Sequence, residues 1–441
     1  MRTVSKTVIG VDFGTQSARA VLVNAENGEI IYSCRKEYPY NSTPVPAIDC
    51  AENLPCATDY EMTLYELLRN VIPEEYRKTV AGICVDATSL TMVLLAEDGR
   101  ALSELDGWSE AAHARVKLWK YHRAQEKADE ALNLARNLQE PFLGRTGGSI
   151  SCEWMLPKLL EVRDEAPEIY SKIDLAMDLC EFLTFRLTGQ LVRSIGSLSY
   201  KCLWAEDLSF PERTFLNGLR AGFYEEYCHF LRGDVRKPGE CAGMLRSELT
   251  KRWGLPEQIP VATGMLDGHT SLATMGAFEP GDAALIVGTS NVCTVQDRKL
   301  QELKDVCGVA QDGMVTGSCG IDTGQSSTGN MLGWFVEHMA GWQIHREAEE
   351  RKISPHQVLA ERIQKPWENK VIAVDWWSGS RNAPCDLTLR GSMSGLEMDT
   401  KTEDIYLALL QAIACGTGTI LESLSGQGVE IGRVLATGGI T

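Results

Sequence analysis

A chain of 441 residues is too long for a single comfortable hydrophobic core, so its length predicts two or three domains. The hydrophobic fraction of 44% and the charged fraction of 23% are those of an ordinary globular protein and exclude a fibrous or disordered chain. A net charge of −17 argues against a nucleic-acid partner, because binding to a polyanion draws mainly on Lys and Arg.

The sequence contains no clear motif for a signal peptide, a membrane span or a metal site. Asp12 interrupts the first apolar stretch before it could serve as a signal-peptide core, and no apolar run approaches transmembrane length. The 14 cysteines include no C-x-x-C pair, and none of the 7 histidines forms an H-x-x-x-H pair. We therefore expect free thiols in a cytoplasmic protein, with no zinc site and no membrane partner. A homodimer is the default expectation for its oligomeric state.

The first elements along the chain are three strands, at residues 7–13, 19–23 and 29–38, and an Asn27-Gly28 turn precedes the third. They predict an antiparallel meander. Residues 58–72 have helical spacing and end at Pro73, and strands are expected at residues 81–88 and 91–99. The mixture of strands and helices indicates an α/β class.

The middle of the chain reads as a helical insertion. A long helix is expected from Ser109 to Asn137, with further helices at residues 154–160 and 178–187. A new sheet pattern starts after Pro260, so we place a domain boundary near residue 258, giving domains 1–258 and 259–441. The stretch "ALIVGTSNVCTV" (284–295) repeats the plan of "VIGVDFGTQSARAVLV" (8–23), which suggests a duplicated domain.

Two turns have the chemistry of phosphate binding. The chain has no Gly-Lys dipeptide, which excludes a Walker A loop, and no G-x-G-x-x-G opens a helix. The turns "GTQS" (14–17) and "GTS" (288–290) can instead present backbone N–H groups and hydroxyls to an anion. Asp12, just before the first turn, suits Mg²⁺ held through its waters, but the residues alone would equally allow a carboxylate that only caps the turn.

The segments "DFGTQSARA" (12–20) and "GSMSGLEMDTKTEDIYLALLQ" (391–411) resemble the two signatures of the FGGY family of carbohydrate kinases. This family is part of the superfamily of hexokinase, actin and heat-shock chaperone ATPase domains. The resemblance implies two actin-like (ribonuclease H-like) domains around a central cleft, with sugar bound mostly by the first domain and ATP mostly by the second. Within the family the closest resemblance is to the branch that acts on L-ribulose, through residues 115–129, 147–170 and 187–204.

The resemblance also implies roles for individual residues. Asp267, in "TGMLDGHTSLATMG" (263–276), would be the general base, with an N-cap role as the alternative. Sugar contacts would be Ser89, Trp119, Lys201, Asp267 and Asp322, although Trp119 and Lys201 could instead be a core residue and a solvated one. Asp322 stands where a Glu is expected. ATP would be bound by Gly14, Thr15, Gln16, Ser17, Gly288, Thr289, Ser290, Gly438 and Gly439, and Mg²⁺ by Asp12.

The expected reaction is transfer of the γ-phosphoryl group of ATP, with Mg²⁺, to the terminal hydroxyl of a ketopentose, with L-ribulose and L-ribulose 5-phosphate as substrate and product. A kinase for another pentulose or polyol, such as D-ribulose or xylulose, is one alternative. A catalytically silent actin-like sugar-binding protein is the other. The chain stops at Thr441, before the helices that follow this turn in such kinases, so we expect either that the C-terminal domain is truncated at its end or that something else completes the adenine pocket.

Overall fold

The structure, a computed structural model, describes residues 6–38, 54–364, 368–382, 386 and 388–439. The contacts divide the chain into two compact units. Unit 1 comprises Met1–Leu143, Ile150–Thr270 and Ala310–Gly317, and unit 2 comprises Gly144–Ser149, Ser271–Val309 and Ser318–Thr441. The units change over inside α10 (Asp267–Met275), whereas the boundary expected near residue 258 lies within unit 1. The assignment of sugar and ATP to residues 1–258 and 259–441 stays a prediction.

The large sheet of unit 1 has the strand order β3-β2-β1-β4-β10-β9, with β11 also paired to β4. Its strands are β1 (Thr7–Phe13), β2 (Ser17–Asn24), β3 (Ile30–Glu37), β4 (Val80–Ala87), β9 (Cys241–Met244), β10 (Pro260–Ala262) and β11 (Met265–Leu266). The first three form the predicted antiparallel meander, while β4 joins β1 in parallel. Gly28 has a φ of 74°, a left-handed conformation that glycine adopts without strain and that the tight turn before β3 requires.

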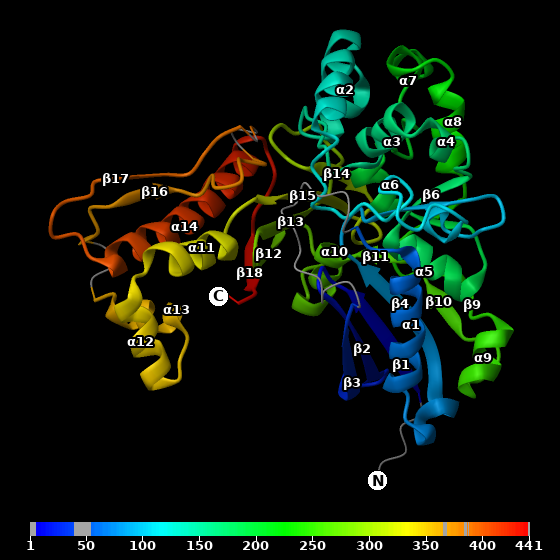
Figure 1. The fold of residues 1–441 in the computed structure, drawn as a ribbon, viewed down its shortest axis with the longest axis horizontal. Helices are drawn as coiled ribbons and strands as arrows, with labels where there is room; N and C mark the ends of the chain where they lie inside the picture. Colours follow the sequence, from blue (N-terminus) through cyan, green and yellow to red (C-terminus); the bar gives the residue numbers. More distant parts are fainter. Residues whose placement is uncertain (1–5, 39–53, 365–367, 383–385, 387, 440–441) are drawn as a thin grey trace. The chain divides into compact units, whose positions relative to one another are not determined.

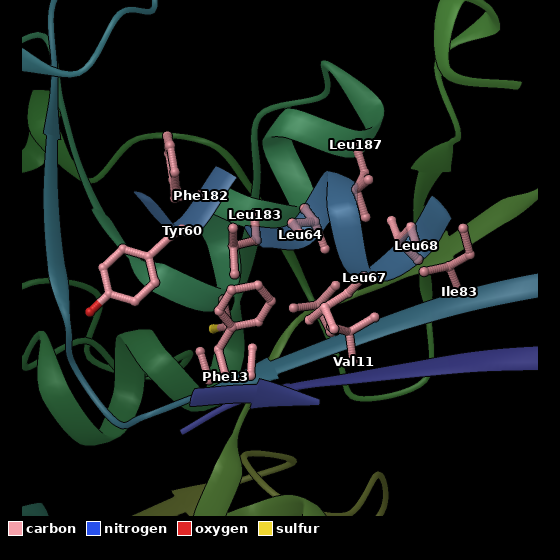
Figure 2. Packing of buried hydrophobic residues seen from close by; sticks show 14 of the residues in the cluster. Val11, Phe13, Tyr60, Leu64, Leu67, Leu68, Ile83, Phe182, Leu183 and Leu187 are labelled. Atoms are coloured by element: carbon pink, nitrogen blue, oxygen red, sulfur yellow. The ribbon is translucent and has the colours of Figure 1, made fainter. Parts of the chain in front are cut away.

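Helices α1 (Ala57–Val71) and α5 (Leu179–Thr188) pack on this sheet (Figure 1). Figure 2 shows Val11 and Phe13 of β1 pointing toward Leu64 and Leu67 of α1 and toward Leu183 of α5. These side chains are buried because apolar residues alternate along β1 and recur at helical spacing in α1. The core therefore fixes the ends of β1 and β4, where the candidate site begins.

Most of the remaining helices of unit 1 form the predicted insertion. They are α2 (Gln125–Leu138), α3 (Met155–Glu165), α4 (Pro167–Tyr170), α6 (Ile195–Lys201), α7 (Arg213–Leu219) and α8 (Phe223–Phe230), while α9 (Ser247–Trp253) lies beside β9 and β10 in the sequence. Short strands accompany them: β5 (Met92–Leu95) with β6 (Leu175–Asp178), and β7 (Val192–Ser194) with β8 (Asp234–Arg236). Short 3-10 helices span Glu74–Thr79, Leu102–Glu104 and Pro141–Arg145.

The long helix expected from Ser109 to Asn137 is wrong over its first half, because only α2 is helical there. Residues 109–124 are mostly turns. Lys117 instead exchanges backbone hydrogen bonds with Met92, and its fully buried ammonium pairs with Glu161 at 3.1 Å. These tertiary contacts override a local sequence that contains neither Gly nor Pro.

The sheet of unit 2 has the order β14-β15-β13-β12-β18. Its elements are α10, β12 (Asp282–Val287), β13 (Asn291–Asp297), β14 (Gly308–Gln311), β15 (Cys319–Gln325), α11 (Gly329–Met339), α12 (Trp342–Arg351), α13 (Pro355–Arg362), β16 (Ile372–Val374), β17 (Ser392–Ser394), α14 (Thr402–Gly426) and β18 (Arg433–Thr437). Strands β12, β13 and β15 form an antiparallel meander, and β18 joins β12 in parallel. This is the plan of β1, β2, β3 and β4, so the predicted duplication is confirmed in the strand topology.

Helix α14 is long and apolar enough to cross a membrane, by length and composition only, with a mean hydropathy of 1.4. The sequence prediction that no run approaches transmembrane length was therefore wrong for this helix. Tyr406, Leu409, Ile413 and Ile420 of α14 are buried in the hydrophobic core of unit 2, and the helix contacts α11 and β15 (Figure 1). It is a core helix of unit 2 in this structure.

Candidate active site

Three aspartates meet at one edge of the sheet of unit 1. Asp12 lies near the end of β1 and faces Asp86 of β4 in the parallel register. The short strand β11 pairs with β4 on the other side, through Met265 and Asp86, and Asp267 follows it directly as the first residue of α10. Parallel strands end at a common edge, so their register brings three carboxyl groups to one place.

Burial disfavours the ionised forms of two of these carboxyl groups. Burial, together with the charge of Asp12, raises the pKa of Asp86 above its usual range. Asp86 Oδ1 is buried and has no hydrogen-bond partner among the described residues. Burial also raises the pKa of Asp267 to about 7, although the Gly268 amide, which donates to Asp267 Oδ1 at 2.7 Å, and the charge of Lys201 both act to lower it. A carboxyl group with a pKa in this range can accept a proton near neutral pH, which is the property that a general base needs.

Asp86 is the residue that the sequence interpretation missed. Of the segment "VDATS" (85–89), only Ser89 is expected from the sequence to contact the sugar. The sequence nevertheless contains a clue, because a Val-Asp pair ends an apolar strand and precedes a turn in "VDATS", as it does in "VDFGT". The parallel register between β1 and β4 is what brings the two carboxylates together.

The first Gly-Thr turn, residues 14–17, is held rigidly between β1 and β2. Gly14 N donates to Ser17 O at 3.1 Å, and the Tyr38 hydroxyl donates to Gly14 O at 2.9 Å. Trp119 Nε1 donates to Thr15 Oγ1 at 3.1 Å, so the proton of the Thr15 hydroxyl points elsewhere. A preorganised turn of this kind can present N–H and hydroxyl groups to an anion.

The second Gly-Thr turn, Gly288 to Ser290, rests on the N-terminus of α11 in unit 2. Gly288 O accepts from the Thr328 hydroxyl at 2.8 Å and from Gly329 N at 2.9 Å, and Thr289 O accepts from Asn330 N at 3.2 Å. A helix N-terminus carries partial positive charge, so this turn lies in surroundings that favour an anion. The sequence interpretation did not include residues 328–330, which lie about 40 positions from the turn.

Gly438 lies at the end of β18, beside β12, the strand that leads into this second turn. It has a φ of 125°, and a Cβ added there would lie 2.3 Å from Val287 O. Only glycine therefore fits the position. A Cβ on Gly439 would meet nothing within 4 Å. The two glycines predicted to bind ATP thus differ sharply in their surroundings.

The sequence-predicted sugar residues are divided between the units. In unit 1, Ser89 follows β4, Trp119 contacts the first Gly-Thr turn, and Lys201 ends α6 close enough to Asp267 to lower its pKa. The Ser89 hydroxyl oxygen is buried without a hydrogen-bond partner among the described residues, as suits a group that awaits a ligand. Asp322 is buried in β15 of unit 2, so its role toward sugar stays a prediction.

No group of three or more His, Cys, Asp or Glu side chains able to hold a metal ion occurs in the described part of the chain. A site built only from protein ligands is therefore missing there. Mg²⁺ in phosphoryl-transfer enzymes is commonly held by one or two carboxylates together with waters and substrate phosphates. Asp12, with the unpartnered oxygen of Asp86 opposite it, fits that pattern. The described cysteines are free thiols.

The N-terminal domain model of the FGGY family of carbohydrate kinases matches residues 7–274, and its C-terminal domain model matches residues 283–441. The chain is 34% identical over 446 residues to the ribulokinase of Halalkalibacterium halodurans, covering 99% of this chain and 79% of that protein. It is 35% identical over 451 residues to the ribulokinase of Mycolicibacterium smegmatis, with the same shares covered.

Two solved structures share the fold. The xylulose kinase of Lactobacillus acidophilus, with ligand bound, matches with a TM-score of 0.77 at 19% identity, covering 99% of this chain and 81% of that one. Plasmodium falciparum glycerol kinase with ADP matches with a TM-score of 0.75 at 16% identity, covering 99% and 82%. Since the family models match almost the entire chain and its two sheets repeat one plan, the chain belongs to the FGGY family of carbohydrate kinases and has their two-domain actin-like fold.

Proposed function

We propose that this chain transfers the γ-phosphoryl group of ATP to the terminal hydroxyl of L-ribulose, giving L-ribulose 5-phosphate and ADP. The observation that carries the proposal is Asp267, a carboxyl group with a pKa of about 7 at the same sheet edge as the Gly-Thr turn that follows Asp12. The choice of L-ribulose rests on relatives named ribulokinase, at 34% and 35% identity over 99% of the chain.

In this proposal the Asp267 carboxylate accepts the proton of the sugar hydroxyl as that oxygen attacks the γ-phosphorus. The new O–P bond forms while the bond between the γ-phosphorus and the bridging oxygen breaks, and ADP leaves with that electron pair. Positioned proton removal of this kind contributes roughly 10²–10⁴-fold to rate. Ser89, Trp119, Lys201 and Asp322 orient the sugar.

We further propose that the turn residues Gly14, Thr15, Gln16 and Ser17 of unit 1 bind phosphate, that Gly288, Thr289 and Ser290 of unit 2 also bind phosphate, and that Gly438 and Gly439 bind the adenosine. Asp12 would hold Mg²⁺, which supplies positive charge to the phosphate oxygens when it is bound. Because ATP would be its substrate, we expect the reaction to take place in the cytoplasm.

A kinase for another pentulose is the second candidate, because Asp322 is one methylene shorter than the Glu expected at this position. The shorter side chain changes which sugar hydroxyl it reaches. A catalytically silent sugar-binding protein is a third, which the pairing of Asp12 with Asp267 at one edge disfavours.

A coupled assay of ADP release tests these candidates. L-ribulose, D-ribulose, both xyluloses and ribitol are each supplied with ATP and Mg²⁺, with Asp267→Asn as the matched inactive control. We expect the highest kcat/KM with L-ribulose. A higher value with xylulose or D-ribulose would transfer the assignment to that sugar, and ADP release that no sugar stimulates would refute the kinase proposal.

A further inference from the structure

The loop between β4 and β5, residues 88–91, has a conformation that its own sequence does not favour. Leu90 has a φ of 43°, in the left-handed region that a side chain branched beyond Cβ rarely adopts. Such a conformation persists only where the surroundings impose it. The same loop carries the unpartnered hydroxyl of Ser89.

Two buried charged side chains hold the loop in this conformation, one through backbone N–H groups and the other through a backbone carbonyl. The Asp178 carboxylate accepts from Leu90 N and from Thr91 N, each at 3.2 Å. The Lys158 ammonium donates to Leu90 O at 3.0 Å. Asp178 and Lys158 are both fully buried, so water competes with neither interaction.

The same ammonium also holds a second segment. Lys158 Nζ donates to Leu118 O at 2.9 Å and to Lys117 O at 3.4 Å. Leu118 directly precedes Trp119, whose indole donates to Thr15 of the first Gly-Thr turn. One ammonium group therefore binds the backbone next to both Ser89 and Trp119, although these residues are 30 positions apart in the sequence.

Packing alone does not explain a charge at this place. Lys158 projects from α3, where its neighbours Met155, Leu156 and Leu159 are core residues. Burial lowers the pKa of Lys158, so the folded protein works against the charged form. An apolar side chain of similar volume would avoid that penalty, but it would remove the hydrogen bond to Leu90 O and would leave Leu118 O and Lys117 O only their bonds from Tyr121 N and Met92 N.

We infer that Lys158 is a positioning residue for the sugar site, fixing the distance between the Ser89 hydroxyl and the Trp119 indole by holding Leu90 and Leu118 on one ammonium group. The inference rests on the proposed function, because it takes Ser89 and Trp119 as sugar contacts. Lys158 itself touches no substrate in this arrangement. Its effect on the reaction passes through the loop and through the Trp119 segment.

The test replaces Lys158 by Met, which keeps an unbranched side chain that ends one atom short of Nζ and removes all of the N–H donors. We expect the KM for L-ribulose to rise about tenfold, the equivalent of one lost hydrogen bond to the sugar, while the KM for ATP stays within about twofold. Lys158→Gln keeps two N–H donors and should give an intermediate KM for sugar. If the Met variant fails to fold, the KM for sugar of the Gln variant tests the inference instead.

Tyr170→Phe is the matched control. The Tyr170 side chain is buried in the same helical part of unit 1, and its hydroxyl donates at 2.7 Å to Glu226 Oε2 of α8, a helix that carries none of the proposed site residues. This variant should lower the melting temperature without changing the KM for sugar. A purely structural role for Lys158 predicts the same behaviour for its variants, and that result would overturn the inference.

A double-mutant cycle with Ser89→Ala tests the route of the effect. If Lys158 acts through Ser89, the loss of the hydroxyl should raise the KM for sugar about tenfold in the wild-type background and by less than about threefold beside Lys158→Met. Equal effects in both backgrounds would contradict that route. If the wild-type protein phosphorylates none of the sugars, the proposed function and this inference are refuted together. If the wild-type protein is active and the Lys158 variants have the same KM for sugar, only the inference is refuted.

Discussion

Lowering the pH from about 8 to about 6 should remove most of the sugar-dependent turnover, because Asp267 must be ionised to accept the proton of the sugar. Burial raises the pKa of Asp267 to about 7. Its ionised fraction then falls from about nine-tenths at pH 8 to about one-tenth at pH 6. If turnover follows this fraction, kcat/KM for L-ribulose falls about tenfold over that range, with its midpoint near pH 7.

Activity is lost at low pH, rather than at high pH, because of the direction of the pKa shift of Asp267. An aspartate with its ordinary pKa, near 4, would be fully ionised across the whole range and would give a flat profile. Because the pKa of Asp267 is raised, activity is instead lost as the pH falls through about 7. The Lys201 charge lowers the pKa of Asp267, so Lys201→Met should move the midpoint to higher pH even though it also weakens sugar binding.

The assay is kcat/KM for L-ribulose from pH 5.5 to 9 at saturating Mg-ATP, because this parameter reports the ionisation of the enzyme form that binds the sugar. The coupling enzymes are kept in excess at each pH. A profile that stays flat between pH 6 and 8 would refute the assignment of the base. A midpoint that moves to lower pH in Lys201→Met would refute the electrostatic account of its pKa.

Two further predictions concern the ATP side and the stability of unit 1. Gly438→Ala should raise the KM for ATP about tenfold or more, because its Cβ would lie 2.3 Å from Val287 O and displace the end of β18. Gly439→Ala, which meets nothing within 4 Å, is the control, and equal effects of the two variants in steady-state kinetics would rule out the steric explanation. Arg193→Met should lower the free energy of unfolding by about 3–5 kcal/mol, because it leaves the buried Glu181, now paired with Arg193 at 2.8 Å, without its partner. Arg351, whose ion pairs with Glu347 and Glu361 are exposed, is the comparison: Arg351→Met should leave the free energy of unfolding nearly unchanged in urea titrations, and equal losses in the two variants would contradict the argument from burial.

The sequence predicts the elements whose pattern is local. The alternation of apolar residues in β1 and the Asn27-Gly28 turn suffice to predict the meander. The repeated Gly-Thr turn suffices to predict the duplicated topology. Spacing and turn chemistry act over a few residues and are visible in any stretch of sequence.

What the sequence could not predict depends on contacts between distant segments. The helix expected from Ser109 fails because Lys117 is drawn to Met92 and Glu161, 25 and 44 positions away. Asp86 was overlooked because its proximity to Asp12 exists only in the parallel register of two strands. The N-terminus of α11 joins the second turn in the same way. Each of these features appears only when the chain has folded.

The central claim is that Asp267 takes the proton from the sugar, and Asp267→Asn tests it most directly. The amide keeps the shape of the carboxyl group and can still accept from Gly268 N, but it cannot serve as a base. We predict that sugar-dependent ADP release falls roughly 10²–10⁴-fold. L-ribulose should still bind, as measured by calorimetry, within a few-fold of the wild-type affinity. An Asp267→Asn variant that keeps near-wild-type turnover would contradict the account.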